Sequence, residues 1–265
     1  MKNPSTIAFI LAAPLLLPAC NGSNGSAPLM GAFQVVNAIP DSQPLDVDIQ
    51  SITTDINNIA FGSASGFRDE PEGSYNVQMT TTPAGGGNSV TITTDNVSID
   101  HNNQTTVYGL GTLAQSSAAG LVVERNSSVT IASGQTEVQF VDAVAAALTS
   151  GTGTVYVVTP GQGTTNPIYS VTLQSPVGNS SSQTPAFSTP TQIASGTYEI
   201  IVQDATNTTV FDSGSNGISF NSGDSVQIAA MDATAAQLSS NGSAMQMLEI
   251  DNASGNATTL LNGAN

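Results

Sequence analysis

The sequence predicts an all-β fold of antiparallel β-sandwiches, and three features of its 265 residues indicate this. Short segments rich in Val, Ile, Thr and Tyr alternate with turns rich in Gly, Ser, Asn, Asp and Pro. In residues 45–49, apolar and acidic residues alternate, which buries one face of a strand and leaves the other in solvent. The third feature is an internal repeat, which predicts two such units.

The repeat consists of matching segments that occur in the same order in both halves of the chain. The clearest pair is a Gly-x-Tyr motif followed by an alternating strand. The matched pairs are 33–38 with 138–143, 45–49 with 153–157, 60–63 with 186–189, 73–77 with 196–200, 103–109 with 223–229, and 121–126 with 247–252. We therefore expect a first sandwich over residues 32–128 and a second over residues 129–265.

Both units have features of an immunoglobulin-like sandwich, since about seven short strands fit into each hundred residues. The Gly-x-Tyr motifs resemble the tyrosine corner of Greek-key sandwiches, which predicts structural roles for Gly73, Tyr75, Gly196 and Tyr198. The second unit carries a polar loop insertion at 161–185. A short helix is expected over 142–148, beginning at Asp142 and closed by Gly151.

The N-terminal segment predicts export and a lipid anchor. Residues 1–19 combine Lys2 with an apolar run too short to span a bilayer, as in a signal peptide. Residues 17–20, Leu-Pro-Ala-Cys, resemble the lipobox of bacterial lipoproteins, and Cys20 is the single cysteine of the chain. The alternative is an incidental cysteine beside an ordinary cleavage site. Residues 20–31 then form the lipidated cysteine and a flexible tether, and Asn21 favours the outer membrane by analogy.

The charge balance excludes nucleic-acid binding. Three Lys and Arg residues stand against 19 Asp and Glu residues, giving a formal net charge of −16. A phosphate backbone requires a basic face, which so few cations do not provide. Because only 8% of residues are charged, the surface is expected to present hydroxyl and amide groups.

Several segments of the first unit together resemble a known family. The opening Val-x-Asn-Ala-x-Pro-Asp at 35–41, the Ala-Phe-Gly at 60–62 and the Gly-x-Tyr strand at 73–77 are similar to domain-of-unknown-function family 4397. The resemblance implies an immunoglobulin-like fold in a secreted or envelope protein of bacteria, often in tandem, and implies no catalytic residues. In the second unit, membership depends mainly on the internal repeat.

Few residues of the chain are candidates for a catalytic, metal or sugar-binding site. His101 lies in a predicted turn, where a solvated side chain is the expected state. Asp41, Asp46 and Asp48 form a weak calcium candidate, because Ca²⁺ binds clustered oxygen ligands; the alternative is a charged face that protects an edge. The absence of Trp counts against the aromatic platforms on which many carbohydrate-binding modules stack sugars, although Tyr108 or Tyr169 could serve singly. We expect no catalytic residues, no cofactor and no firm metal site.

Three functions remain open. We expect a non-catalytic, lipid-anchored envelope or surface protein, attached through Cys20, that acts as a structural, adhesive or interaction module with an envelope protein or glycan as partner. The alternative is a glycan- or polymer-binding surface lipoprotein. An enzyme would need an acid pair assembled from distant segments.

Overall fold

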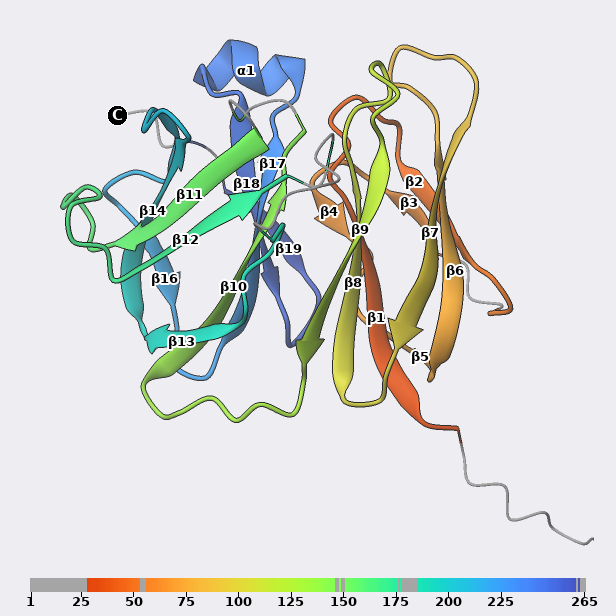
Figure 1. The fold of residues 1–265 in the computed structure, drawn as a ribbon, viewed down its shortest axis with the longest axis horizontal. Helices are drawn as coiled ribbons and strands as arrows, with labels where there is room; N and C mark the ends of the chain where they lie inside the picture. The colour runs from red at the N-terminus through yellow and green to blue at the C-terminus, as the bar shows by residue number, and fades with distance from the viewer. Residues whose placement is uncertain are drawn as a thin grey trace, which may run out of the picture.

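The computed structural model describes residues 28–52, 56–145, 148, 151–175, 177, 185–260 and 262. These residues form nineteen strands and one short helix, arranged in four stacked sheets (Figure 1). The predicted all-β, sandwich-type fold is therefore confirmed. No helix in these described ranges is long and apolar enough to cross a membrane.

The first sandwich contains an outer sheet of order β3-β2-β6-β7 and an inner sheet of order β4-β1-β8-β9, in which β5 also pairs with β1. Its core includes Phe33, Val47, Val77 and Val107, from both sheets. The strands are β1 (Met30–Asn37), β2 (Leu45–Ile49), β3 (Ile56–Ile59), β4 (Ser63–Ala64), β5 (Arg68–Pro71), β6 (Gly73–Thr81), β7 (Val90–Ile99), β8 (Asn103–Leu110) and β9 (Ala119–Asn126).

The second sandwich repeats this plan with an inner sheet of order β13-β10-β17-β18-β19 and an outer sheet of order β12-β11-β14-β15, where β16 also pairs with β14. Phe140, Val155, Ile200 and Ile228 lie in its core. The elements are β10 (Gln135–Ala143), β11 (Thr152–Val158), β12 (Tyr169–Gln174), β13 (Thr191–Ala194), β14 (Gly196–Asp204), β15 (Thr209–Asp212), β16 (Ile218–Phe220), β17 (Ser225–Asp232), α1 (Ala235–Asn241), β18 (Met245–Asp251) and β19 (Ala257–Leu260).

The two inner sheets pack against each other, which makes one body of the two sandwiches. A third apolar cluster joins Val36, Tyr108 and Val123 of the first sandwich to Val141 and Leu248 of the second. Strands β10 and β17 are therefore buried on both faces. The central strand of each inner sheet has a parallel neighbour, β1 with β8 and β10 with β17.

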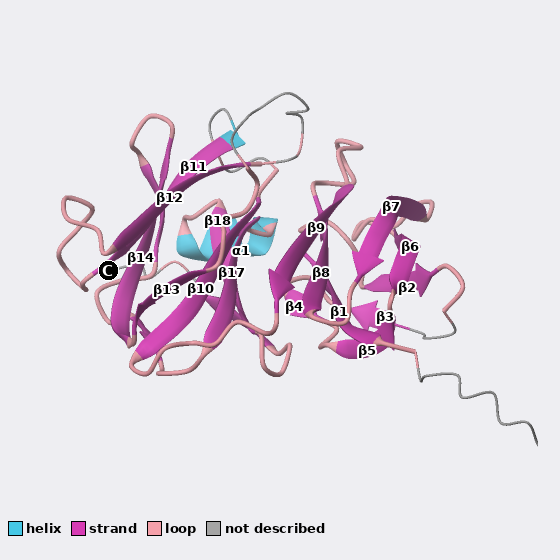
Figure 2. Cartoon of the chain, turned by 60° about the horizontal axis from the view of Figure 1, so that its bottom comes forward, coloured by secondary structure: helices cyan, strands magenta, loops and turns pink. Residues whose placement is uncertain are grey.

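The predicted helix over 142–148 is wrong at its start. Asp142 and Ala143 are the last residues of β10. The Asp142 carboxylate accepts a hydrogen bond from the Val144 N–H at 3.0 Å, which forms a turn at the end of the strand. Pairing of β10 with β17 extends to Ala143 and overrides the predicted helix start, while residues 146 and 147 lie outside the described part. The helix of the described residues is α1, which begins after Thr234, has a capping box with Gln237, and ends at Gly242 (Figure 2).

The structure also corrects parts of the repeat alignment. Val36 pairs with Tyr108 and Val141 pairs with Ala229, so β8 and β17 align one residue away from the predicted match. The predicted match of 60–63 with 186–189 is wrong by three residues. Ser65 and Ser188 are the equivalent positions, since they make the same hydrogen bonds to Val35 and Phe140. The expected loop 161–185 contains strand β12, while residues 176 and 178–184 lie outside the described part.

Candidate functional site

The two motif tyrosines make the same contact in both sandwiches. The Tyr75 hydroxyl donates to the Pro71 carbonyl at 2.9 Å, and the Tyr198 hydroxyl donates to the Ala194 carbonyl at 2.5 Å. A Cβ atom at Gly73 would lie 2.9 Å from the Tyr75 hydroxyl oxygen, so a larger residue there would displace the tyrosine ring. These contacts tie β6 and β14 to the preceding chain.

The three aspartates of the calcium candidate do not converge on a common site. Asp41 accepts the N–H groups of Leu113 and Ala114 at 2.9 and 2.8 Å, while Asp46 accepts the Asn58 N–H at 2.9 Å. Asp48 is exposed on β2. Among the described residues, no group of three or more His, Cys, Asp or Glu side chains could hold a metal ion.

His101 lies in an exposed turn, where Nδ1 is 3.0 Å from Glu72 Oε2. Cys20, the predicted lipidation residue, and the signal peptide lie outside the described residues. Tyr108 is fully buried between the inner sheets, so it offers no platform for a sugar, and burial raises its pKa well above the usual value. Its hydroxyl donates to Gln227 of the second sandwich.

A polar hollow of about 370 Å³ lies beside Asp46 on the first outer sheet. Asn58 and Gln43 contribute amides to its lining, and Thr80 and Ser89 contribute hydroxyls. It offers hydrogen-bonding groups without an aromatic surface. The predicted residue Asp46 therefore lies in a polar depression rather than in a cation cage.

A larger groove, of about 490 Å³, lies where the two sandwiches meet. The first sandwich contributes Glu124 of β9, and the second contributes Tyr169 and Val171 of β12 together with Phe187 and neighbouring prolines. Phe140 stacks on the Tyr169 ring with centroids 5.9 Å apart and planes at 16°. A concave, mainly apolar surface with a few polar groups at a domain junction is typical of a ligand site. This groove is the candidate functional site.

Glu124 gives the groove its charge. Partial burial, and then repulsion from Asp100, raises the pKa of this carboxyl group. Within the described residues, no hydrogen bond or ion pair that engages its carboxylate is found. Thr189 and Ser188 also line the groove, but the Ser188 hydroxyl is buried and accepts the Phe140 N–H. The groove is thus lined mainly by apolar and aromatic residues of the second sandwich, with Glu124 of the first sandwich at its border.

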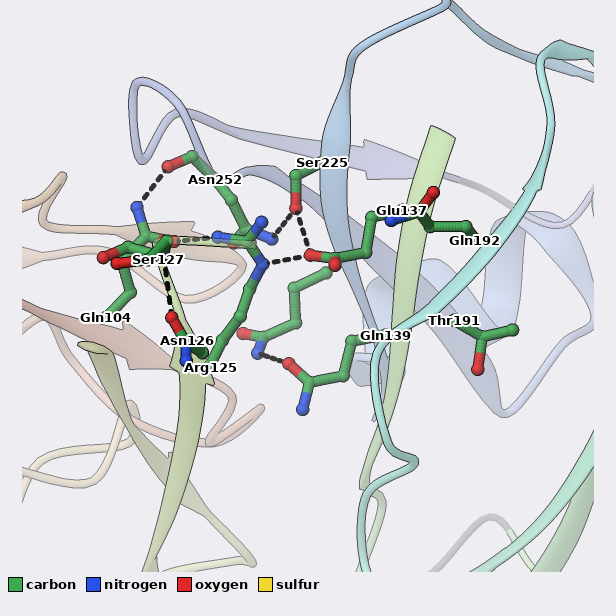
Figure 3. Close-up of polar contacts among 12 residues, drawn as sticks. Gln104, Arg125, Asn126, Ser127, Glu137, Gln139, Thr191, Gln192, Ser225 and Asn252 are labelled. Atoms are coloured by element: carbon green, nitrogen blue, oxygen red, sulfur yellow. Dashed lines mark hydrogen bonds and ion pairs between the residues drawn. The ribbon is translucent and has the colours of Figure 1, made fainter. Parts of the chain in front are cut away.

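The residue after Glu124 anchors β9 to the second sandwich. The Arg125 guanidinium forms a buried ion pair with Glu137 of β10 and donates to Gln104 at 2.7 Å (Figure 3). Ser225 donates to Glu137 at 3.0 Å, and Asn252 donates to Ser225 at 3.0 Å. This network crosses the junction and ties β9 of the first sandwich to β10 and β17 of the second.

A second acidic feature lies in the core of the second sandwich. Asp142 is 2% exposed, and its Oδ2 has no hydrogen bond within the described structure. Burial, with a smaller contribution from the Asp232 charge, raises its pKa to about 7, although the Val144 N–H opposes the shift. Asp232 itself accepts the Ala145 N–H at 2.7 Å. The carboxyl group of Asp142 faces apolar side chains rather than a cleft.

The sequence analysis missed Glu124, Arg125 and Glu137 as site residues. A usable signal was present, because Arg125 is one of only two arginines in the chain and interrupts an apolar strand. Its partner could not be inferred from spacing, since the ion pair depends on how two sheets from different sandwiches meet.

Comparison with known families supports the predicted resemblance. Residues 31–149 match the family model described as "Domain of unknown function (DUF4397)". This match confirms the resemblance found in the segments at 35–41 and 73–77.

Among solved structures, the chain is similar to "The Bacillus anthracis TIE protein", with 11% sequence identity and a TM-score of 0.21. The similarity covers 77% of this chain and 34% of that chain, so it spans about a third of the TIE protein. A TM-score this low does not relate the two folds. No curated protein matches the chain.

Proposed function

We propose that this chain, whose residues 31–149 match DUF4397, is a non-catalytic, lipid-anchored interaction module of the bacterial cell envelope. In this proposal Cys20 carries the lipid at the outer membrane, and residues 20–31 connect it to β1. The two sandwiches act together as a structural or adhesive unit outside the cytoplasm.

The packing of the two inner sheets is the observation that carries the proposal. An apolar cluster fills the space between these sheets, and the buried Arg125–Glu137 ion pair also joins the two sandwiches. Both features support a single stiff unit rather than two domains that move independently on a flexible linker. A buried ion pair favours one relative register of the parts that it joins. A stiff, acidic body with few surface cations suits a spacer that holds a binding face away from the membrane.

Glycan or polymer binding is a second candidate function, and the groove at the junction favours it. Tyr169 is one of the two tyrosines that could stack singly on a sugar, and it lines this groove. The exposed faces of the outer sheets add hydroxyl pairs such as Thr80–Thr91 and Thr154–Thr172, at 3.2 and 2.9 Å.

The anchor is tested in cells with a short epitope tag placed between Gly85 and Gly86, in an exposed turn where an added Cβ meets no atom within 4 Å. We expect the tagged chain to incorporate an alkyne-labelled fatty acid and to fractionate with the outer membrane. The tagged Cys20→Ala variant should lose both properties. Retention of the label by this variant would contradict lipidation at Cys20, and cytoplasmic retention of the parent chain would contradict the envelope location.

A further inference from the structure

The first strand of the folded body has hydrogen-bonded neighbours on both sides. Strand β1 pairs with β8 in parallel at six positions, which join residues 32–37 to residues 104–109. On its other side, β1 pairs with β5 at four positions and with β4 at two. An edge strand has one neighbour and can be peeled away from its sheet. Strand β1 would have to be drawn out from between two neighbours.

The side chains of β1 also hold it in the body of the molecule. Phe33 and Val35 are completely buried in the core of the first sandwich, and Val36 is buried in the apolar cluster between the sandwiches. The Gln34 Nε2 donates to the Thr106 Oγ1 at 3.0 Å, and both of these side chains are buried. Sliding β1 along its own axis would therefore disrupt two apolar clusters and a buried hydrogen bond.

The direction of β1 determines how a pull on the preceding residues acts on these contacts. Because β8 is parallel to β1, both strands begin at the same end of the sheet, next to the turn at His101. The turn between β6 and β7 lies at the opposite end, where the Ala84 N–H donates to the carbonyl of Asp41, four residues beyond β1, at 2.8 Å (Figure 1). A pull on Pro28 away from the body therefore acts along β1.

A pull along a strand loads its hydrogen bonds in shear. In shear, the bonds share the load and must break together, whereas a pull sideways from one end breaks them one after another. A single hydrogen bond contributes little by itself, so the sharing of the load is what makes a strand resist force. Resistance to force depends on the rate of unfolding rather than on equilibrium stability. A central strand aligned with the pull is therefore suited to carry tension.

We propose that the chain bears tension, and that β1 is the strand through which a pull on the membrane tether enters the folded body. This inference rests on the proposed function, because the lipid anchor at Cys20 is what places the load on β1. The second sandwich has the same arrangement, since β10 is a central strand and is parallel to β17. The Arg125–Glu137 ion pair joins the end of β9 to the start of β10, so β10 begins at the same end as β1.

The test compares two directions of pull on the purified full-length chain by single-molecule force spectroscopy. All variants carry Cys20→Ala, so that the handles attach only at introduced cysteines. Handles at Pro28→Cys and Gly85→Cys pull along β1, because Gly85 lies in the far turn, where an added Cβ meets no atom within 4 Å. Handles at Pro28→Cys and His101→Cys instead pull the starts of β1 and β8 apart. Pro28 and His101 are both exposed.

We expect the chain to unfold at a several-fold higher force along β1 than in the direction that separates β1 from β8, at the same loading rate. Equal forces in the two directions, or a lower force along β1, would overturn the proposal. Urea unfolding of the two double-cysteine variants, measured without force, should be equal, and this establishes that the difference comes from direction.

A pair of hydroxyl replacements tests whether β1 carries the load. Thr106→Val removes the hydrogen bond between Gln34 of β1 and β8. Thr154→Val removes the exposed Thr154–Thr172 contact of the second outer sheet, which lies off the path of the load, and is the matched control. We expect Thr106→Val to lower the unfolding force along β1 and Thr154→Val to leave it unchanged. An unchanged force in folded Thr106→Val, or equal losses in the two variants, would overturn the role given to β1.

The force measurements and the test of the anchor fail independently. The pulled chains lack Cys20, so absence of lipidation in cells would leave the difference between the two directions unaffected. Loss of that difference would overturn the tension-bearing role of β1 and would leave fatty-acid labelling at Cys20 as it is.

Discussion

Replacement of Asp142 by asparagine should change how the stability of the protein depends on pH. Asp142 is 2% exposed, with Oδ1 bound to the Val144 N–H at 3.0 Å and Oδ2 without a partner among the described residues. Burial raises its pKa to about 7, from 3.8. The equivalent position of the first sandwich already carries an amide, Asn37, whose Oδ1 accepts the Ile39 N–H at 3.0 Å. Asparagine therefore fits the local turn.

The sign of the effect follows from the raised pKa. The proton binds more tightly to the folded chain, so the stability from this group is fully present below about pH 4. It is lost as the pH rises to about 7. The gap between 3.8 and about 7, at about 1.4 kcal/mol for each pKa unit, makes the loss about 4 kcal/mol. An asparagine avoids that loss, but its amide nitrogen replaces an unpartnered oxygen, at a cost of about 1–3 kcal/mol.

We therefore expect Asp142→Asn to stabilise the protein by about 1–3 kcal/mol at pH 8 and to be neutral or destabilising at pH 4. Urea unfolding followed by far-ultraviolet circular dichroism between pH 4 and pH 8 measures this difference. Asp95→Asn, at an exposed position on β7, is the control and should follow the parent chain. Parallel pH profiles for Asp142→Asn and the parent would refute the reasoning.

Three further predictions concern the junction, the motif tyrosines and the overall charge. Arg125→Met leaves Glu137 buried without its cation and should cost about 3–5 kcal/mol in urea unfolding, whereas Glu72→Gln, in an exposed pair, should cost less than about 1 kcal/mol. Tyr198→Phe removes one hydrogen bond and should cost about 1 kcal/mol in the same assay; no change would contradict the role given to the hydroxyl. Added NaCl should leave the melting temperature unchanged or raise it, since it screens a net charge of −16; a marked fall would contradict this.

Strand β2 of the first outer sheet was predictable because only one of its faces is buried. Leu45, Val47 and Ile49 alternate with exposed aspartates, and their match to residues 153–157 agrees with the structural register. For the inner strands β8 and β17, the predicted match between the two sandwiches was wrong by one residue, because both faces of these strands are buried. An alternating pattern cannot fix a register when neither face is polar.

The candidate site was less predictable than the fold. Tyr169 was recognised as an available aromatic residue, but the companion Tyr108 lies between the sheets. Glu124 gained significance only when the first sandwich was placed against the second. Segments distant in sequence form the groove, so no local motif marks it. Asp142 looked like a helix cap because its burial depends on β17 beside it.

The packing of the two inner sheets resembles a dimer interface, and this determines how a single copy would behave if it were expressed alone. Equivalent strands of the two copies meet there, as in an interface between two identical subunits. The tandem chain is thus a covalently fused pseudo-dimer, in which residues 127–134 keep the second copy at a high effective concentration. A single copy expressed alone would expose the apolar face around Val36 and Val123 and should associate with itself. Truncated forms would then report on association rather than on the function of the intact chain.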